Sequence, residues 1–135
     1  MKKSIAYVVV AALMLVSATG CKEKNDVEAA GQACLKDART ALGANDYAKA
    51  KDCIAKLRKD FPLALNAREE GILLLDSIDL AEARVQLAEC ERQANRPNLS
   101  NLERDTLGIN LDRAQQKVKF FLKKLETDKA GKKQH

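Results

Sequence analysis

The sequence predicts an all-α protein that forms one small domain. Its 135 residues include only six Gly and two Pro, and 46% are hydrophobic while 4% are aromatic, a composition typical of helices rather than of β-sandwiches or disordered chains. Apolar side chains recur at steps of three and four residues, as one face of a helix requires. The single histidine, His135, offers little for metal binding or imidazole chemistry. We therefore expect neither an enzyme nor a metal or cofactor site.

The first 20 residues have the pattern of an export signal. Lys2 and Lys3 precede an apolar run from Ile5 to Val16, and small residues follow as far as Gly20. The run would extend roughly 18 Å as a helix, well short of the ~30 Å hydrocarbon core of a bilayer. We therefore expect segment 1–20 to be removed rather than to remain as a transmembrane helix.

The junction Ala18-Thr19-Gly20-Cys21 resembles a bacterial lipobox. The resemblance implies that Cys21 is acylated, becomes the first residue of the mature protein and anchors it in a membrane. The absence of Asp directly after Cys21 resembles outer-membrane rather than inner-membrane lipoproteins. The alternative is a secreted protein cleaved after Ala18, in which Cys21 is a free thiol. Residues 21–26 mix charges and lack apolar side chains, so they are predicted to form a solvated tether.

The single helical domain is expected over residues 27–128, and its first hairpin over 27–62. A helix over 27–43 would present Val27, Ala30, Cys34, Ala38 and Ala41 on one face. Gly43 ends it, and Asn45 or Asp46 caps a second helix over 46–60. The inner face of that helix would carry Tyr47, Ala50, Ile54 and Leu57. Pro62 ends it, because the residue before a proline avoids helical dihedrals.

Residues 31–64 resemble a tetratricopeptide repeat, a helical hairpin of 34 residues. Asp46-Tyr47 stands at the turn, Ala50 and Ile54 match the A-x3-F element, and Pro62 matches the closing proline. In the first helix, Cys34, Asp37, Ala38 and Ala41 stand where the repeat carries larger residues. The resemblance implies a protein-binding helical module in which Tyr47, Ala50, Ile54 and Pro62 pack the hairpin. A plain helical hairpin with a similar turn is the alternative.

One such repeat cannot bury its own apolar face, so a second, longer hairpin over 63–127 should cover it. A helix over 64–94 would carry two apolar rows, one of Leu74, Ile78, Ala81, Val85 and Ala88, the other of Leu73, Leu80 and Leu87. Together these rows form a wide apolar face that would contact both the first hairpin and another helix.

A capping box, Ser100-Asn101-Leu102-Glu103, opens the last helix. Its apolar positions alternate steps of four and three, as in a coiled coil, at Leu107, Leu111, Ala114, Val118, Phe121 and Leu125. A short loop implies that it packs antiparallel to the helix over 64–94. The basic tail, residues 129–135, is predicted to be disordered.

Three cysteines remain besides Cys21, in a compartment that permits disulfides. Cys34 and Cys53 are equally distant in sequence from the predicted turn, so a bridge between them is conceivable. The interpretation that we favour treats Cys34, Cys53 and Cys90 as small buried apolar residues.

Basic residues accumulate in the last helix and indicate a candidate contact with an anionic surface, such as lipid phosphates or an acidic protein. The candidates are Lys117, Lys119, Lys123 and Lys124. The competing interpretation is a solubilising helix face whose cations suit the C-terminal end of the helix dipole. Two short segments, around Ser77 and Thr106, resemble the O-glycosylation signal of some anaerobic bacteria; a helical position facing solvent explains them equally well.

Together these features predict a lipoprotein of the cell envelope, held at the outer membrane by Cys21, that acts as a non-catalytic protein-interaction or assembly module. Its partners would be the membrane and a protein of unknown identity, with no nucleic acid and no small-molecule substrate. The alternative is a structural spacer that contacts anionic lipid or glycan through its basic last helix.

Overall fold

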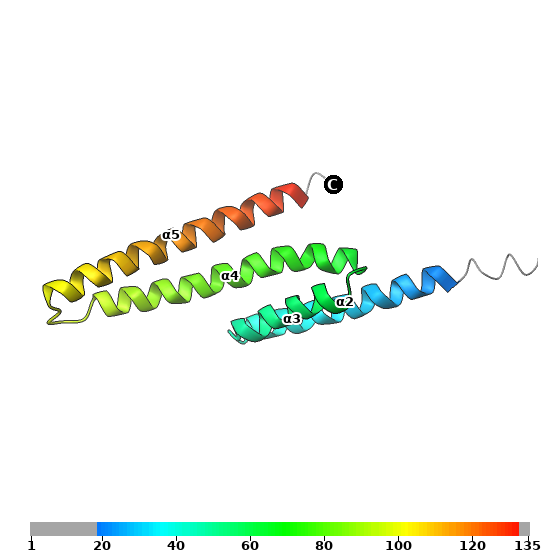
Figure 1. Ribbon diagram of the computed structural model, residues 1–135, viewed down its shortest axis with the longest axis horizontal. Helices are drawn as coiled ribbons and strands as arrows, with labels where there is room; N and C mark the ends of the chain where they lie inside the picture. The colour runs from blue at the N-terminus through cyan, green and yellow to red at the C-terminus, as the bar shows by residue number, and fades with distance from the viewer. Residues whose placement is uncertain (1–18, 133–135) are drawn as a thin grey trace, which may run out of the picture.

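The computed structural model describes residues 19–132 and contains four helices in that range. They are α2 (Thr19–Gly43), α3 (Tyr47–Asp60), α4 (Leu65–Ala94) and α5 (Asn101–Lys132). The prediction of an all-α fold, a helical hairpin followed by a longer antiparallel hairpin, is confirmed (Figure 1). Residues 1–18 of the predicted export signal lie outside the described residues.

The molecule is elongated because the two hairpins differ in length. α2 and α3 lie alongside the first half of α4, whereas α4 and α5 continue together to the loop at the far end (Figure 1). We call the part that extends beyond α2 and α3 the distal arm (residues 84–118). The three-helix part formed by α2, α3 and the first half of α4 we call the base.

The helix ends follow from local sequence signals. Asp46 caps α3 by accepting a hydrogen bond from the Lys49 backbone N–H at 3.0 Å, and Asn45 adopts a left-handed conformation with φ 59°. The capping box of α5 forms as predicted. Glu103 accepts hydrogen bonds from the Ser100 backbone N–H at 2.9 Å and from its hydroxyl at 2.7 Å.

Two segments expected to be irregular are helical instead. The predicted tether, residues 21–26, is part of α2, which begins at Thr19. The predicted tail is helical up to Lys132, and its last three residues lie outside the described range. Both corrections have the same physical reason: Lys, Glu and Ala are good helix formers, and a helix that is already nucleated extends at little cost.

The apolar core lies in the base. Its completely buried members include Leu35, Ala38, Ala50, Ile54, Leu57, Ala64, Ala67 and Ile78. The inner face of α3 is confirmed, with Ala50, Ile54 and Leu57 buried. On α2 the buried face is centred on Leu35, which the predicted face omitted, so the helix is rotated slightly from the expected orientation.

α4 buries two faces, as its two apolar rows predict. Ile78 belongs to the core shared with α2 and α3, whereas Leu80 is buried on the other row. The first row was expected to stay covered as far as Ala88. That was wrong: Val85 is 54% exposed and Ala88 is exposed, because α3 begins at Tyr47 and does not reach them.

The hairpins approach closely at Gly31 of α2. A Cβ added at position 31 would lie 2.6 Å from the Cβ of Ala64 and 2.9 Å from that of Ala67. Neither alanine has a flexible end that could move away, so only glycine fits without a backbone shift. Glu28, one turn earlier, accepts hydrogen bonds from the backbone N–H groups of Asn66 at 3.3 Å and of Ala67 at 2.7 Å. These contacts join α2 to the first turn of α4.

Replacing Gly31 by Ala should therefore destabilise the protein. We expect the close contact with α4 to outweigh the better helix propensity of alanine and to lower the free energy of unfolding by roughly 1–3 kcal/mol. Urea unfolding followed by circular dichroism measures this change. Gly108→Ala is the matched control, since a Cβ there meets nothing within 4 Å; it should raise stability by about 0.5–1 kcal/mol. Equal shifts for both variants would contradict the packing at Gly31.

Candidate interaction surfaces

A charged cluster joins α4 to α5. Asp76 of α4 is only 2% exposed and accepts a hydrogen bond from the Lys124 ammonium of α5. Lys124 also donates to Asp128, one turn further along α5, at 2.8 Å. The second carboxylate oxygen of Asp76, Oδ2, is buried and has no hydrogen-bond partner. The cluster thus holds a carboxylate in the helix interface with only part of its hydrogen-bonding capacity satisfied.

The two carboxyl groups of this cluster have pKa values shifted in opposite directions. Burial raises the pKa of Asp76, and the hydrogen bond from Lys124 only partly opposes this effect. The same ammonium lowers the pKa of the better solvated Asp128. Hydrogen bonds to Asp128 and Asp76 in turn raise the pKa of Lys124. Burial in the helix interface therefore destabilises the ionised form of Asp76.

Asp76 occupies a position in the seam between the two long helices. Steps of three and four connect the side chains that follow it along α4: Asp76, Leu80, Ala83, Leu87 and Cys90. Since Asp76 contacts α5, this row is the face of α4 that α5 covers. One polar residue in an otherwise apolar seam fixes helix register at some cost in stability. The predicted row of Leu73, Leu80 and Leu87 takes only every seventh residue and therefore omits Asp76. A row that includes the intermediate positions at steps of three and four contains Asp76.

The four candidate lysines do not form one surface. At 3.6 residues per turn, Lys117 and Lys124 lie on one side of α5, and Lys119 and Lys123 lie roughly 130° away. Lys117 donates a hydrogen bond to Gln86 of α4 at 2.8 Å. Lys124 is paired with Asp76 and Asp128, and its assignment to an anionic surface stays a prediction. Asp128 lies four residues later in α5, whereas Asp76 lies 48 residues earlier in the chain, beyond the reach of a local pattern.

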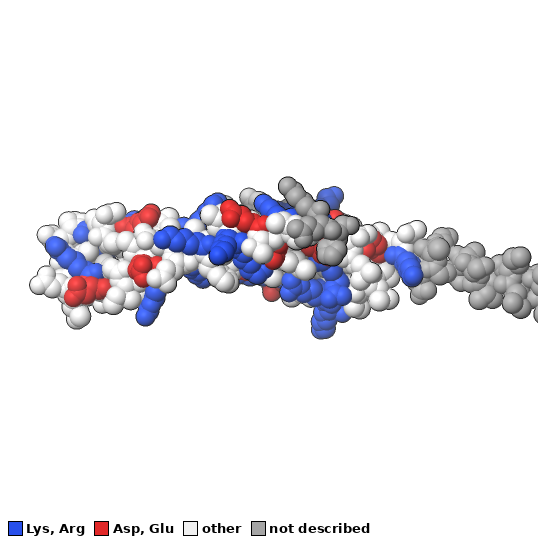
Figure 2. All heavy atoms as spheres, turned by 90° about the horizontal axis from the view of Figure 1, so that it is seen from above, with Lys and Arg blue, Asp and Glu red and all other residues white. Residues whose placement is uncertain are grey.

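Lys119 and Lys123 remain exposed. Figure 2 shows the α5 side of the molecule, where cations are interspersed with acidic and uncharged residues rather than gathered into one patch. The interpretation of these lysines as part of a solvated helix face is therefore as well supported as the one that assigns them to an anionic surface.

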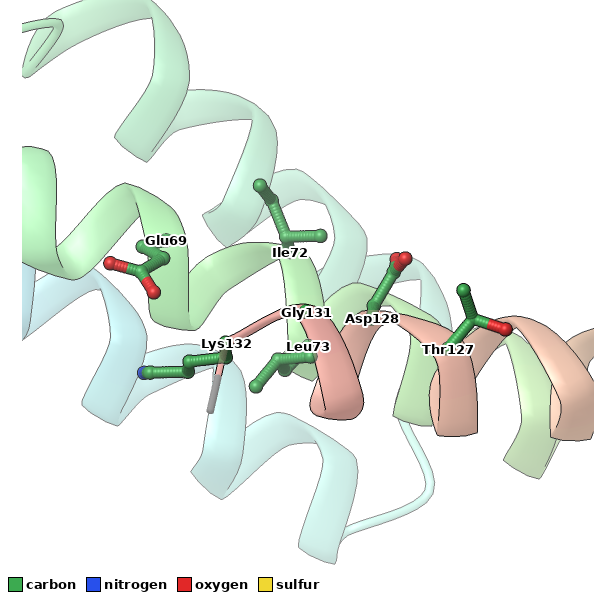
Figure 3. A pocket seen from close by; sticks show the side chains of 7 residues that line it. All are labelled: Glu69, Ile72, Leu73, Thr127, Asp128, Gly131 and Lys132. Carbon is green, nitrogen blue, oxygen red and sulfur yellow. The ribbon is translucent and has the colours of Figure 1, made fainter. Parts of the chain in front are cut away.

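Two shallow grooves lie between α4 and α5. One, of about 570 Å³, is near the end of α5, where Thr127, Asp128, Gly131 and Lys132 face Glu69, Ile72 and Leu73 of α4 (Figure 3). The other, of about 530 Å³, lies on the distal arm. Its lining consists of Val85, Gln86, Glu89 and Cys90 from α4 and Asn110, Arg113, Ala114 and Lys117 from α5.

The lining of the distal groove includes apolar residues, with Val85 at its α4 edge, and the basic residues Arg113 and Lys117 on α5. Val85 belongs to the same apolar row of α4 that α2 and α3 cover in the base. At Val85, none of the described residues covers this row. Glu89 is engaged by Arg92 at 2.6 Å, which lowers the pKa of Glu89 to about 2. The charges of Arg113 and Lys117 are left uncompensated by any ion pair with the described residues. The groove is thus suited to an amphipathic segment with acidic side chains.

Other ion pairs join α2 and α3 to α4 in the base. Lys51 of α3 reaches Asp79 at 2.8 Å and Glu82 at 2.6 Å on α4. Hydrogen bonds to these two acids raise the pKa of Lys51. On α2, Arg39 contacts Glu70 of α4 at 2.7 Å. The charged side chains that gather between helices therefore serve contacts that hold the hairpins together.

The residues predicted to pack a tetratricopeptide-like hairpin have different surroundings. Ala50 and Ile54 are buried in the core, whereas Tyr47 is half-buried and donates a hydrogen bond to Asn45 at 3.1 Å. Pro62 is exposed in the turn before α4. The hairpin is present, and its assignment to that repeat stays a prediction.

The three described cysteine thiols, those of Cys34, Cys53 and Cys90, are free and half-buried. Burial raises the pKa of the Cys34 thiol, which keeps it in its protonated and less reactive form. Cys34 and Cys53 are thus not bridged, and all three cysteines are half-buried rather than buried as expected.

The two glycosylation-like segments differ in accessibility. Ser77 lies within α4 between Asp76 and the completely buried Ile78, and its hydroxyl donates to the Leu73 carbonyl at 2.8 Å. Thr106 is exposed on α5. Of the two, only Thr106 lies in a segment open to solvent.

Comparisons of the chain with protein families, with curated proteins and with solved structures found no match. Between Thr19 and Lys132, none of the helices is long and apolar enough to cross a bilayer. In the same part of the chain, no group of three potential ligands among His, Cys, Asp and Glu is placed to hold a metal ion.

The charged cluster predicts a specific pH dependence of stability. Because the pKa of Asp76 is raised in the folded protein, its favourable contribution is present at low pH and is lost as pH rises above 3.8 through the raised value. Asp76→Asn should therefore gain stability relative to the wild type as pH rises from below 3.8 through the raised pKa of Asp76. Urea unfolding at several pH values measures the difference.

Asp128→Asn is the matched control for that experiment. The pKa of Asp128 is lowered, so its contribution is present above 3.8 and is lost as pH falls. This variant should lose stability relative to the wild type as pH rises from the lowered value to 3.8, and the difference should stay constant above that pH. Identical pH profiles for the two variants would contradict the opposed pKa shifts.

Proposed function

We propose that this protein is a lipid-anchored helical module of the bacterial cell envelope, whose distal arm binds a partner protein without catalysis. The anchor is Cys21, and the membrane is the outer membrane. The observation that carries the proposal is the distal arm itself: an ordered two-helix extension with a groove, lined in part by apolar and basic residues, that its own base leaves uncovered.

The position of the anchor supports this division of roles. Thr19, Gly20 and Cys21 of the lipobox-like segment are the first residues of α2, and the distal arm lies at the opposite end of the molecule (Figure 1). An acyl chain contributes about 0.8 kcal/mol per buried methylene, and two or three chains give stable attachment. Anchoring thus requires nothing from the folded helices, which remain available for a partner.

The groove supports a helical segment as the bound element. An antiparallel helix pair offers a natural trough for a third helix, because side chains of the added helix fit between those of the pair. Val85 would contact its apolar face, and Arg113 and Lys117 would contact acidic residues at its edge.

A second function is favoured by the exposure of Lys119 and Lys123 on α5. In that proposal, the protein is a spacer that contacts anionic lipid or glycan through these two lysines. Each cation near an anionic surface contributes about 1 kcal/mol, so two of them would give weak and salt-sensitive binding.

The anchor predicts a modified N-terminus. Protein isolated from its native envelope should begin at Cys21 and carry the mass of a diacylglycerol thioether with or without an amide-linked acyl chain. Mass spectrometry of the intact protein and of its N-terminal peptide tests this. An unmodified N-terminus at Thr19 would show the alternative cleavage and would refute the anchor.

The distal groove predicts that one charge change abolishes partner binding. In detergent-solubilised envelopes, wild-type protein should retain a stoichiometric partner, and Val85→Glu should lose it because a carboxylate replaces an apolar residue of the groove lining. Quantitative mass spectrometry after affinity purification measures the loss.

The Lys119→Glu/Lys123→Glu variant is the matched control, since it also adds acidic groups to exposed positions but lies away from the groove. It should retain the protein partner. If this variant instead loses salt-sensitive binding to anionic vesicles, and Val85→Glu changes nothing, the spacer function is supported and the groove is refuted.

A further inference from the structure

The turn between α3 and α4 exposes two large apolar side chains. Leu63 is 75% exposed and Leu65 is 68% exposed, whereas Ala64 between them is completely buried and Phe61 packs against the core. Two backbone hydrogen bonds hold this turn. The Ala64 N–H donates to the Phe61 carbonyl at 3.1 Å, and the Leu65 N–H donates to the Leu63 carbonyl at 2.9 Å. The two leucines are therefore held outward by a fixed turn.

This turn lies at the same end of the molecule as the start of α2. Glu28 of α2 caps the first turn of α4, and α2 continues past the turn toward the N-terminus (Figure 1). At 1.5 Å per residue, the segment from Cys21 to Glu28 extends about 10 Å along α2. The leucines are thus near the point at which the proposed lipid anchor enters the membrane.

Charged residues of both signs flank the turn. Arg58 and Lys59 occupy the last turn of α3, and Arg68 donates a hydrogen bond to the Pro62 carbonyl at 2.7 Å. Asp60, Glu69 and Glu70 lie beside them in sequence. Exposed leucines with adjacent Arg and Lys are typical of surfaces that lie at a bilayer interface, where apolar groups enter the headgroup boundary and cations contact phosphates.

We infer that the α3–α4 turn is a second membrane contact, which inserts Leu63 and Leu65 into the headgroup region of the bilayer that holds the anchor. The inference rests on the proposed acylation of Cys21. Packed helices lie about 8–10 Å apart, so a tilt of the molecule by roughly 45° brings the turn to the level of Cys21. Two contacts, anchor and turn, then define an orientation in which the distal arm points away from the membrane.

A single tryptophan tests this contact, because the natural chain contains none. The acylated, full-length variant Leu63→Trp is purified from envelopes and reconstituted into vesicles of phosphatidylethanolamine and phosphatidylglycerol. Part of the lipid carries bromine on the acyl chains near the headgroup, where it quenches tryptophan fluorescence. We expect the emission to shift to shorter wavelength and to be strongly quenched.

Leu102→Trp is the matched control. Leu102 is 77% exposed, almost the same as Leu63, but it lies beside the loop at the far end of the distal arm. Its tryptophan should remain unquenched. Circular dichroism of both variants checks that the helices are retained, as expected for substitutions at exposed positions.

Flotation of the vesicles in a density gradient separates the two hypotheses. If the protein floats with the vesicles but Leu63→Trp is not quenched, the turn contact is refuted and the anchor stands. If both tryptophans are quenched, the molecule lies flat and the tilted orientation is refuted. If the acylation is missing and the protein does not float, the anchor fails and the inference fails with it.

Discussion

The structure depends on the long helix α4 burying two faces against two different neighbours. One face, which includes Ala67, Gly71 and Ile78, closes the core with α2 and α3. The other carries Asp76 and Leu80 and forms the seam with α5. Neither hairpin can bury its own apolar surface, so α4 makes the two halves one folding unit. Glycine at positions 31 and 71 lets the base close tightly around this helix, since a side chain at either position would press on its neighbours.

The neighbours of α4 cover its two faces over different lengths. α2 and α3 cover one face only in the base, whereas α5 covers the other face along the distal arm as well (Figure 1). Lys51 makes the contacts with Asp79 and Glu82 that mark the limit of α3 on α4. Beyond this limit only α5 accompanies α4, and the uncovered face carries Val85. The proposed roles follow from this geometry, with attachment at the end near Cys21 and binding on the arm. The buried Asp76 fits the same view, because a carboxylate that is partly unsatisfied contributes specificity of helix register more than stability.

Local patterns in the sequence were sufficient for the four helices and for the helix ends at the turns between them, but not for the start of α2 or the end of α5. Asp46, Pro62 and the Ser100 capping box are signals that act within one helical turn, so they can be recognised without knowing the fold. Contacts between helices could not be predicted in the same way. The row through Val85 continues the helical period, but periodicity does not reveal where the covering hairpin stops. The contact between Lys124 and the buried Asp76 joins residues that are distant in sequence, and Gly31 carries no side chain whose pattern could draw attention to it.

The most direct test of this account is hydrogen exchange of the backbone amides in the purified, partner-free protein. Amides of the distal arm in 84–94 and 101–112 should be protected by helix formation but should exchange faster than those of 65–82, because only the latter lie in the part of α4 covered by α2 and α3. Equal protection along the whole of α4 would mean that the arm is covered by another surface and is not a free-standing binding element. A complete lack of protection in the arm would mean that no preformed groove exists.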